Sequence, residues 1–275
     1  IGAMRYADVK NYADAKKWVN KISAPEYAFD KAVLKASIAA EEGNMAAALT
    51  EARRAEKLPE QGRFFGAAEL QRVYLFALAQ SDKPQTALVE LNQMMAKAAR
   101  QPEAAERLSD VLYQRAMVYE KLGQHEKAIA DLRRYNDLNP NSASGMNALG
   151  YTLLIMPNGK QYFDEAFKLI QTAYHLEPES AAINDSLGWA YYLKGDAQAA
   201  LPYLEYAYRE HPDAEVASHL GEVLWQLGQQ EQAKQIWQDG LQQEGDQALL
   251  KATMKRFGVA VPNAQPVRKA KPKAK

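Results

Sequence analysis

The sequence predicts an all-helical protein built from tandem repeats. Among its 275 residues alanine is abundant, whereas Gly (15) and Pro (12) are sparse, and this composition favours helices over sheets. Apolar residues make up 47% and aromatic residues 9%, enough for a packed core. The third observation decides the architecture: small residues recur at near-constant spacing along the chain, which is typical of solenoids.

The repeat is clearest over residues 115–140 and 187–212. Its marks in the second segment are Gly188, Tyr191, Gly195, Ala200, Ala207 and Pro212. This pattern resembles the tetratricopeptide repeat, a helix–turn–helix unit in which small residues at positions 8, 20 and 27 let two helices approach closely. Proline at position 32 ends the second helix. The resemblance implies a right-handed superhelical solenoid of antiparallel helix pairs.

One position of the repeat can be followed along the whole chain. Position 20 falls on Ala15, Ala48, Ala87, Ala128, Ala166, Ala200 and Ala233. We therefore expect about seven repeats over residues 1–258. The longer spacings between these alanines indicate extended helices or inserted turns, such as the Pro-Asn-Gly turn at 157–159.

The two ends of the repeat array differ. The first repeat is incomplete, so we expect the chain to be a fragment of a longer protein. At the other end Leu250, Met254 and Phe257 form one apolar stripe, which predicts a capping helix near residues 248–257. Residues 259–275 hold three prolines and five basic residues, and we expect a disordered basic tail. Three hypotheses for this tail follow: a solubilising terminus, a contact with an anionic membrane or cell wall, and a contact with nucleic acid.

Motifs of enzymes are missing from the sequence. It has no glycine-rich phosphate loop, no nucleophile elbow and no pair of histidines at the i, i+4 spacing of a helical zinc site. The absence of cysteine excludes disulfides and cysteine-ligated metals within the chain. The formal net charge of zero argues against polyanion binding by the whole chain. The sequence therefore predicts a protein that is not an enzyme and uses no cofactor or metal.

The resemblance also implies a binding surface. In the tetratricopeptide family, positions 2, 5, 9, 12 and 13 of each repeat line a concave groove. Carried over to this sequence, they give a candidate partner-binding set of Tyr113, Met117, Asn147, Tyr151, Asp185, Trp189, Tyr192, Glu222 and Trp225. An aromatic, acidic groove favours a protein or extended peptide with apolar anchors and positive charge, and disfavours nucleic acid. The alternative is that the rings pack against the neighbouring repeat.

Residues 146–240 carry a more particular resemblance. Segments such as INDSLGWAYY and VASHLGEVLWQLG are similar to the C-terminal repeats of proteobacterial outer-membrane tetratricopeptide lipoproteins. That family includes an adaptor for a periplasmic C-terminal processing protease. The resemblance implies a periplasmic scaffold that is anchored through a lipid on a part of the protein absent from this chain. Its partners would be the protease and peptidoglycan hydrolases. The alternative function is a structural assembly factor of an envelope secretion or pilus machine.

Overall fold

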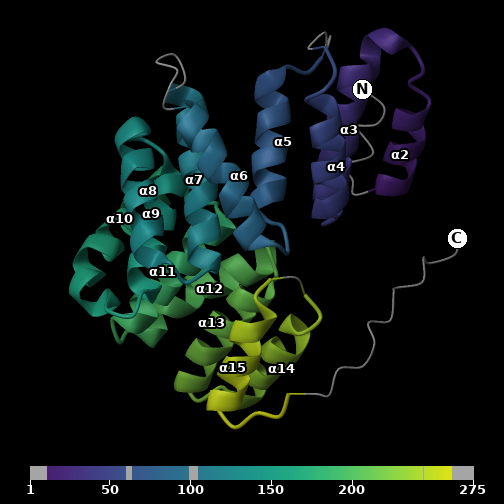
Figure 1. Cartoon of the computed structure of the whole chain (residues 1–275). Coiled ribbons are helices and arrows are strands. Elements are labelled where there is room, and N and C mark those ends of the chain that lie inside the picture. The colour runs from purple at the N-terminus through teal and green to yellow at the C-terminus, as the bar shows by residue number, and fades with distance from the viewer. Residues whose placement is uncertain (1–10, 60–63, 99–104, 244, 262–275) are drawn as a thin grey trace, which may run out of the picture. The chain divides into compact units, whose positions relative to one another are not determined.

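The computed structural model describes residues 11–59, 64–98, 105–243 and 245–261 (Figure 1). Two expectations lie outside this part of the chain: the beginning of the incomplete first repeat, and the basic tail beyond residue 261. Throughout the described ranges the secondary structure is helical and no strand occurs, which confirms the predicted all-α class. None of the described helices is both long and apolar enough to cross a membrane.

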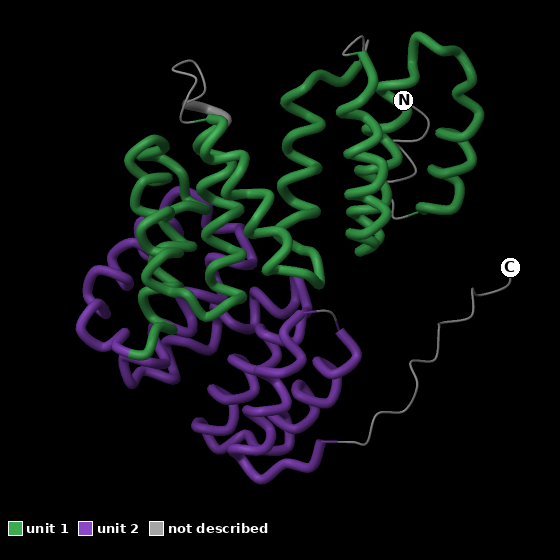
Figure 2. The backbone as a smooth tube through the Cα atoms, viewed as in Figure 1, with its two compact units in different colours: residues 1–157 green, residues 158–275 purple. Residues whose placement is uncertain are grey.

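The chain divides into two compact units, residues 1–157 and residues 158–275 (Figure 2). The helices of the first unit are α2 (Tyr12–Asn20), η1 (Pro25–Tyr27), α3 (Ala28–Glu41), α4 (Met45–Ala55), α5 (Ala67–Ala79), α6 (Pro84–Ala98), α7 (Ala105–Lys121), α8 (His125–Leu138) and α9 (Ala143–Ile155). Those of the second unit are η2 (Gly159–Tyr162), α10 (Phe163–Leu176), α11 (Ala181–Leu193), α12 (Ala197–Glu210), α13 (Ala214–Gln226), α14 (Gln230–Gly240) and α15 (Gln247–Arg256). Short turns connect most consecutive helices, as expected for helix pairs.

The alanine series marks the same place in every pair. Each of these alanines is the fourth residue of an even-numbered helix, from α2 to α14. All seven are at most 1% exposed. The alanine position was therefore predicted correctly, and the reason is steric: a side chain larger than a methyl group has no room where the two helices meet.

Glycines permit close helix approach in the second unit. A Cβ atom on Gly188 would lie 2.6 Å from Cγ of Leu204, and one on Gly221 would lie 2.1 Å from Nε1 of Trp237. Both contacts are far shorter than van der Waals distance, so α11 and α13 each need a glycine facing their partner helix. The prolines act as predicted, because α8, α10 and α12 end two residues before Pro140, Pro178 and Pro212.

The last described helix covers the end of the second core. In α15, Leu250 and Met254 are completely buried against the cluster that contains Leu220 and Trp237. Asp246 caps its N-terminus by accepting hydrogen bonds from the backbone of residues 248 and 249.

The boundary of the tail needs a correction. The sequence predicts that a disordered tail starts at residue 259. In the structure, Val259 and Val261 are partly buried and pack against the same core cluster as α15. Burial of two β-branched side chains favours an ordered extension, so Val259 and Val261 belong to the packed part of the second unit.

Candidate functional site

The predicted groove positions of the first unit lie on α7 and α9. All four of them are half-buried: Tyr113, Met117, Asn147 and Tyr151. The ring of Tyr113 lies 5.1 Å from the ring of Tyr135 on α8, and burial raises the pKa of Tyr113, with smaller contributions from Tyr135 and Glu120. This part of the predicted surface is therefore partly engaged in packing within the unit.

The predicted positions of the second unit lie on α11 and α13. The aromatic residues Trp189, Tyr192 and Trp225 are half-buried, whereas Asp185 and Glu222 are buried. Both carboxylates have partners on the next helix of the inner row, which consists of α11, α13 and α15. We call the resulting set of contacts the inner-row network; it consists of Asp185, Trp189, Tyr192, His219, Glu222, Trp225 and Arg256.

The first link of the network joins α11 to α13. Nδ1 of His219 lies 3.0 and 3.1 Å from the two carboxylate oxygens of Asp185, and His219 is only 3% exposed. Burial by itself would lower the pKa of His219. The charge of Asp185 and its hydrogen bond outweigh that effect, so the pKa is raised above its ordinary value. Protonation of His219 is therefore favoured over that of a free imidazole, and the protonated ring neutralises the buried carboxylate.

Trp189 packs against the His219 side of this pair. Its ring stacks on the imidazole of His219 at a centroid distance of 4.1 Å and an interplanar angle of 18°. On α11 it also stacks against Tyr192, with a centroid distance of 5.1 Å. Two stacked neighbours restrict the rotamers of a half-exposed tryptophan, which leaves its remaining surface in a defined orientation.

The second link joins α11 and α13 to α15. The hydroxyl of Tyr192 donates to Oε1 of Glu222 at 3.1 Å, while Arg256 forms an ion pair with the other carboxylate oxygen. Burial and the neighbouring Glu222 raise the pKa of Tyr192 to about 12. Tyr192 is therefore a neutral hydrogen-bond donor at physiological pH.

Trp225 is the member of the network that packs against Trp237 of α14 and Phe257 at the end of α15. Its ring lies 5.6 Å from that of Trp237 and 5.4 Å from that of Phe257. Lys234 is placed over its face, 6.0 Å from the ring centroid. Trp225 is therefore held by packing on two sides. For this ring, the alternative of packing against neighbouring helices applies.

The structure corrects the expected role of the acidic residues. The sequence predicts that Asp185 and Glu222 lie beside the aromatic anchors as negative charges facing a partner. Instead His219 and Arg256 pair with them, because isolated carboxylates are costly to bury. Of the predicted residues on the inner row, Trp189, Tyr192 and Trp225 are the ones that remain partly exposed.

Sequence reasoning missed the two positive members of the network. Asp185 and His219 are 34 residues apart, as are Glu222 and Arg256. That separation equals the length of one repeat, so a search for opposite charges one repeat apart would have found both pairs. Within the described ranges no group of three or more His, Asp or Glu residues is arranged to hold a metal ion.

Comparison with known families identifies the repeats. Two family models, each described as a tetratricopeptide repeat, match residues 109–142 and 191–256. These two segments are therefore similar to tetratricopeptide repeats. Repeats of this family generally form binding scaffolds without catalytic activity, and the second match covers most of the inner-row network.

A relative from Pseudomonas aeruginosa carries the same repeats. The chain is 41% identical over 113 residues to a TPR repeat-containing protein of that organism. The match covers 41% of this chain and 19% of the relative. The chain therefore spans about a fifth of the length of the curated relative that it matches.

Solved structures show the same fold. A tetratricopeptide repeat protein from Parabacteroides merdae superposes with a TM-score of 0.61 at 16% identity, covering 92% of this chain and 94% of that one. A thermophilic TPR protein from Thermus thermophilus superposes with a TM-score of 0.53 at 20% identity, covering 68% and 96%. At such low identity these neighbours confirm the solenoid fold of the repeats and nothing more specific.

Proposed function

We propose that the chain is a non-enzymatic scaffold that binds a partner polypeptide through the inner row of helices in its second unit. Tetratricopeptide repeats generally bind proteins or peptides, and stacked helix pairs present long binding surfaces. The inner row adds three aromatic side chains of the types that dominate binding hot spots.

The main support for this proposal is the position of Trp189. Its ring is half-buried and stacked on both His219 and Tyr192. A core tryptophan would be fully covered, as Trp237 is at 0% exposure. A partner that covers the remaining surface of Trp189 gains apolar burial without the entropy cost of ordering the side chain.

The compartment and the partners form a finer proposal. It rests on the similarity of residues 146–240 to outer-membrane tetratricopeptide lipoproteins. The chain would belong to a periplasmic, lipid-anchored adaptor that brings a C-terminal processing protease to peptidoglycan hydrolases. The alternative is an assembly factor for an envelope secretion or pilus machine, which would use the same surface with different partners.

Affinity capture from envelope extract of the native host tests both levels of the proposal. The bait is the whole chain, and its captured proteins are compared with those of a Trp189→Ala variant. We expect that variant to lose captured partner roughly thirtyfold, the loss typical of a hot-spot tryptophan worth about 2 kcal/mol. The control is Trp18→Ala on α2, which removes an exposed tryptophan of the first unit.

The outcomes are distinct. A processing protease and its hydrolase clients in the eluate favour the adaptor, whereas subunits of one envelope machine favour the assembly factor. Equal capture by the Trp189→Ala variant, with its helical circular dichroism unchanged, would exclude the inner row as the binding surface. A Trp189→Phe variant, which keeps an aromatic ring in the stack, separates a lost contact from a destabilised fold.

A further inference from the structure

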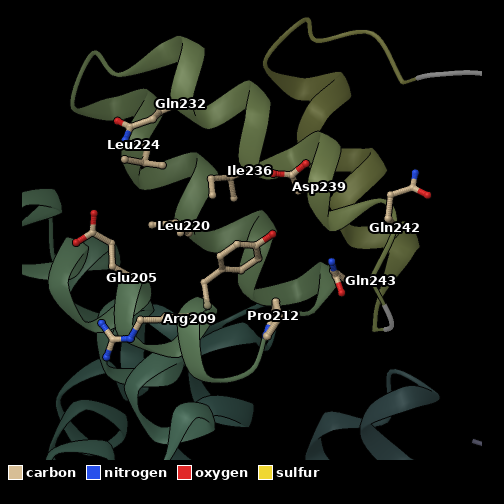
Figure 3. Close-up of a pocket in the computed structure, with 11 residues that line it drawn as sticks. Glu205, Arg209, Pro212, Leu220, Leu224, Gln232, Ile236, Asp239, Gln242 and Gln243 are labelled. Carbon is tan, nitrogen blue, oxygen red and sulfur yellow. The ribbon is translucent and has the colours of Figure 1, made fainter. Parts of the chain in front are cut away.

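The second unit also carries a groove outside the inner-row network. It is an open groove of about 750 Å³ with α12 and α14 as its walls and α13 as its floor. Figure 3 shows Leu220, Leu224 and Ile236 between Glu205 on one wall and Asp239 on the other. A cavity of this size accommodates several side chains of a peptide, and none of its lining residues belongs to the inner-row network.

The floor and the rim of the groove differ in chemistry. Leu220 and Leu224 are each 3% exposed and form an apolar floor, whereas Glu205 and Asp239 are exposed at the rim. Asp239 accepts a hydrogen bond of 2.9 Å from Gln235. The groove therefore favours a segment that combines an apolar residue with positive charge.

One cation also lies at the groove. Nε of Arg209 donates to Glu210 at 2.9 Å, and the guanidinium lies over the ring of Tyr206 at 5.1 Å. Its charge is thus partly neutralised by Glu210. The two rim carboxylates leave the groove with a negative balance.

The chain carries a segment with the complementary chemistry. Residues 262–275 contain Arg268, Lys269, Lys271, Lys273 and Lys275 and no acidic residue. Val267 is the only apolar residue among them larger than alanine, prolines aside. By contrast, residues 158–261 hold fifteen Asp and Glu against eight Lys and Arg, a formal net charge of −7. Charge in the second half of the chain is therefore segregated between an acidic folded unit and a basic terminus.

The groove is within reach of this segment. Val261, the last described residue, packs against the core cluster that also contains Leu220 and Leu224. Fourteen residues extend over about 46–50 Å, whereas a folded unit of this size has a radius of gyration of about 13 Å. A tether of this length also gives an effective concentration in about the millimolar range, so a weak contact is sufficient for occupancy.

We propose that residues 262–275 dock in the groove between α12 and α14 of the same molecule. Val267 contacts the apolar floor, and the basic residues that follow it face Glu205 and Asp239. The docked segment covers the groove. A basic segment of another protein would have to compete with it for this surface. This proposal is independent of the inner row and of the identity of its partners.

The absence of cysteine allows a direct test in the full chain. One cysteine replaces Ala270 in the basic segment, and a second replaces Gln232, which lines the groove and is exposed. The control pair joins Ala270→Cys with Thr172→Cys, an exposed position on α10. Reaction with a short bis-maleimide at low ionic strength is followed by mass spectrometry of the monomeric product.

We expect the groove pair to cross-link within the molecule roughly tenfold faster than the control pair, because docking concentrates the tethered segment near one site. Neutralising the rim with Glu205→Gln and Asp239→Asn, or adding about 0.5 M salt, should remove most of that difference. The matched charge control is Asp164→Asn with Glu177→Gln, two exposed positions away from the groove, and it should retain the difference.

Three results would overturn the proposal. Equal rates for the two cysteine pairs would show that the segment has no preference for the groove. A fast reaction that is insensitive to rim neutralisation would exclude the carboxylates as its basis. Cross-linked dimers in place of monomers would show that the groove takes the segment of a second copy. Gln242→Cys on the groove edge replaces Gln232→Cys if the first substitution disturbs folding.

Discussion

The two units of the chain each bury an aspartate between helices, and they neutralise it differently. In the first unit, Arg115 on α7 holds Asp131 on α8 through two hydrogen bonds of 2.7 Å and also donates to Asn92. In the second unit, His219 on α13 holds Asp185 on α11. Arginine stays charged at every accessible pH, whereas histidine does not. The first unit therefore has a permanent link within one helix pair, and the second has a titratable link between successive pairs.

Loss of the permanent link should have the largest effect. Asp131→Ala leaves the Arg115 guanidinium, whose side chain is only 16% exposed, without its carboxylate. Because arginine does not release its proton, we expect a loss of about 3 kcal/mol in the free energy of unfolding. Urea denaturation followed by circular dichroism measures it. A loss well below 1 kcal/mol would show that Arg115 finds another partner or reaches solvent.

Loss of the titratable link should cost less at alkaline pH. In Asp185→Ala, His219 is left without its carboxylate but becomes neutral by releasing a proton. We expect a loss of about 1–2 kcal/mol at pH 8, close to that for one unsatisfied buried hydrogen-bonding group. The same denaturation experiment ranks the two variants. An equal loss in both would contradict the distinction between the two links.

The pH dependence sharpens the comparison further. The pKa of His219 is raised in the folded state, with Asp185 the main opposing influence to burial and with Glu215 and Glu222 adding to it. Stabilisation by the link is therefore fully present below the ordinary histidine pKa of about 6.5. It is lost as the pH rises through the folded-state value, with a slope of at most about 1.4 kcal/mol per pH unit.

Denaturation of the wild type and of Asp185→Asn between pH 5 and pH 9 tests this sign. The stability difference between them should shrink as the pH rises. The corresponding difference for Asp131→Asn should stay nearly constant over the same range. A wild type that gains stability relative to Asp185→Asn on alkalinisation would contradict the assignment of a protonated His219 to the folded state.

The smallest effect concerns the end of the second unit. Deleting residues 262–275 should change its stability by less than about 0.5 kcal/mol, because exposed charge pairs contribute little. Deleting residues 259–275 also removes Val259 and Val261 from the core cluster and should cost about 1–2 kcal/mol. Thermal unfolding of the two truncated chains distinguishes them. Identical midpoints would return the boundary to residue 258.

The sequence by itself determined the helices, their pairing and their ends. Ala48 and Ala200, in different units, occupy the same completely buried position, and helices end before Pro140 and Pro178 as predicted. These features are local: helix propensity, the room between two adjacent helices and the conformation of proline are fixed by residues close together in the chain. A 34-residue repeat displays them again and again, so they can be read without coordinates.

Only the tertiary structure decided how the side chains on the inner row are used. Asp185 appears in the sequence as an exposed acidic residue of a groove, yet it is buried because His219, one repeat later, reaches it. Glu222 likewise forms an ion pair with Arg256 of α15. Val259 and Val261, which the sequence assigns to a tail, pack on the core. Each outcome depends on the distance between helices of successive repeats. That distance sets the cost of burying a charge and the gain from burying an apolar side chain. It is a property of packing across repeats and is encoded in no single repeat.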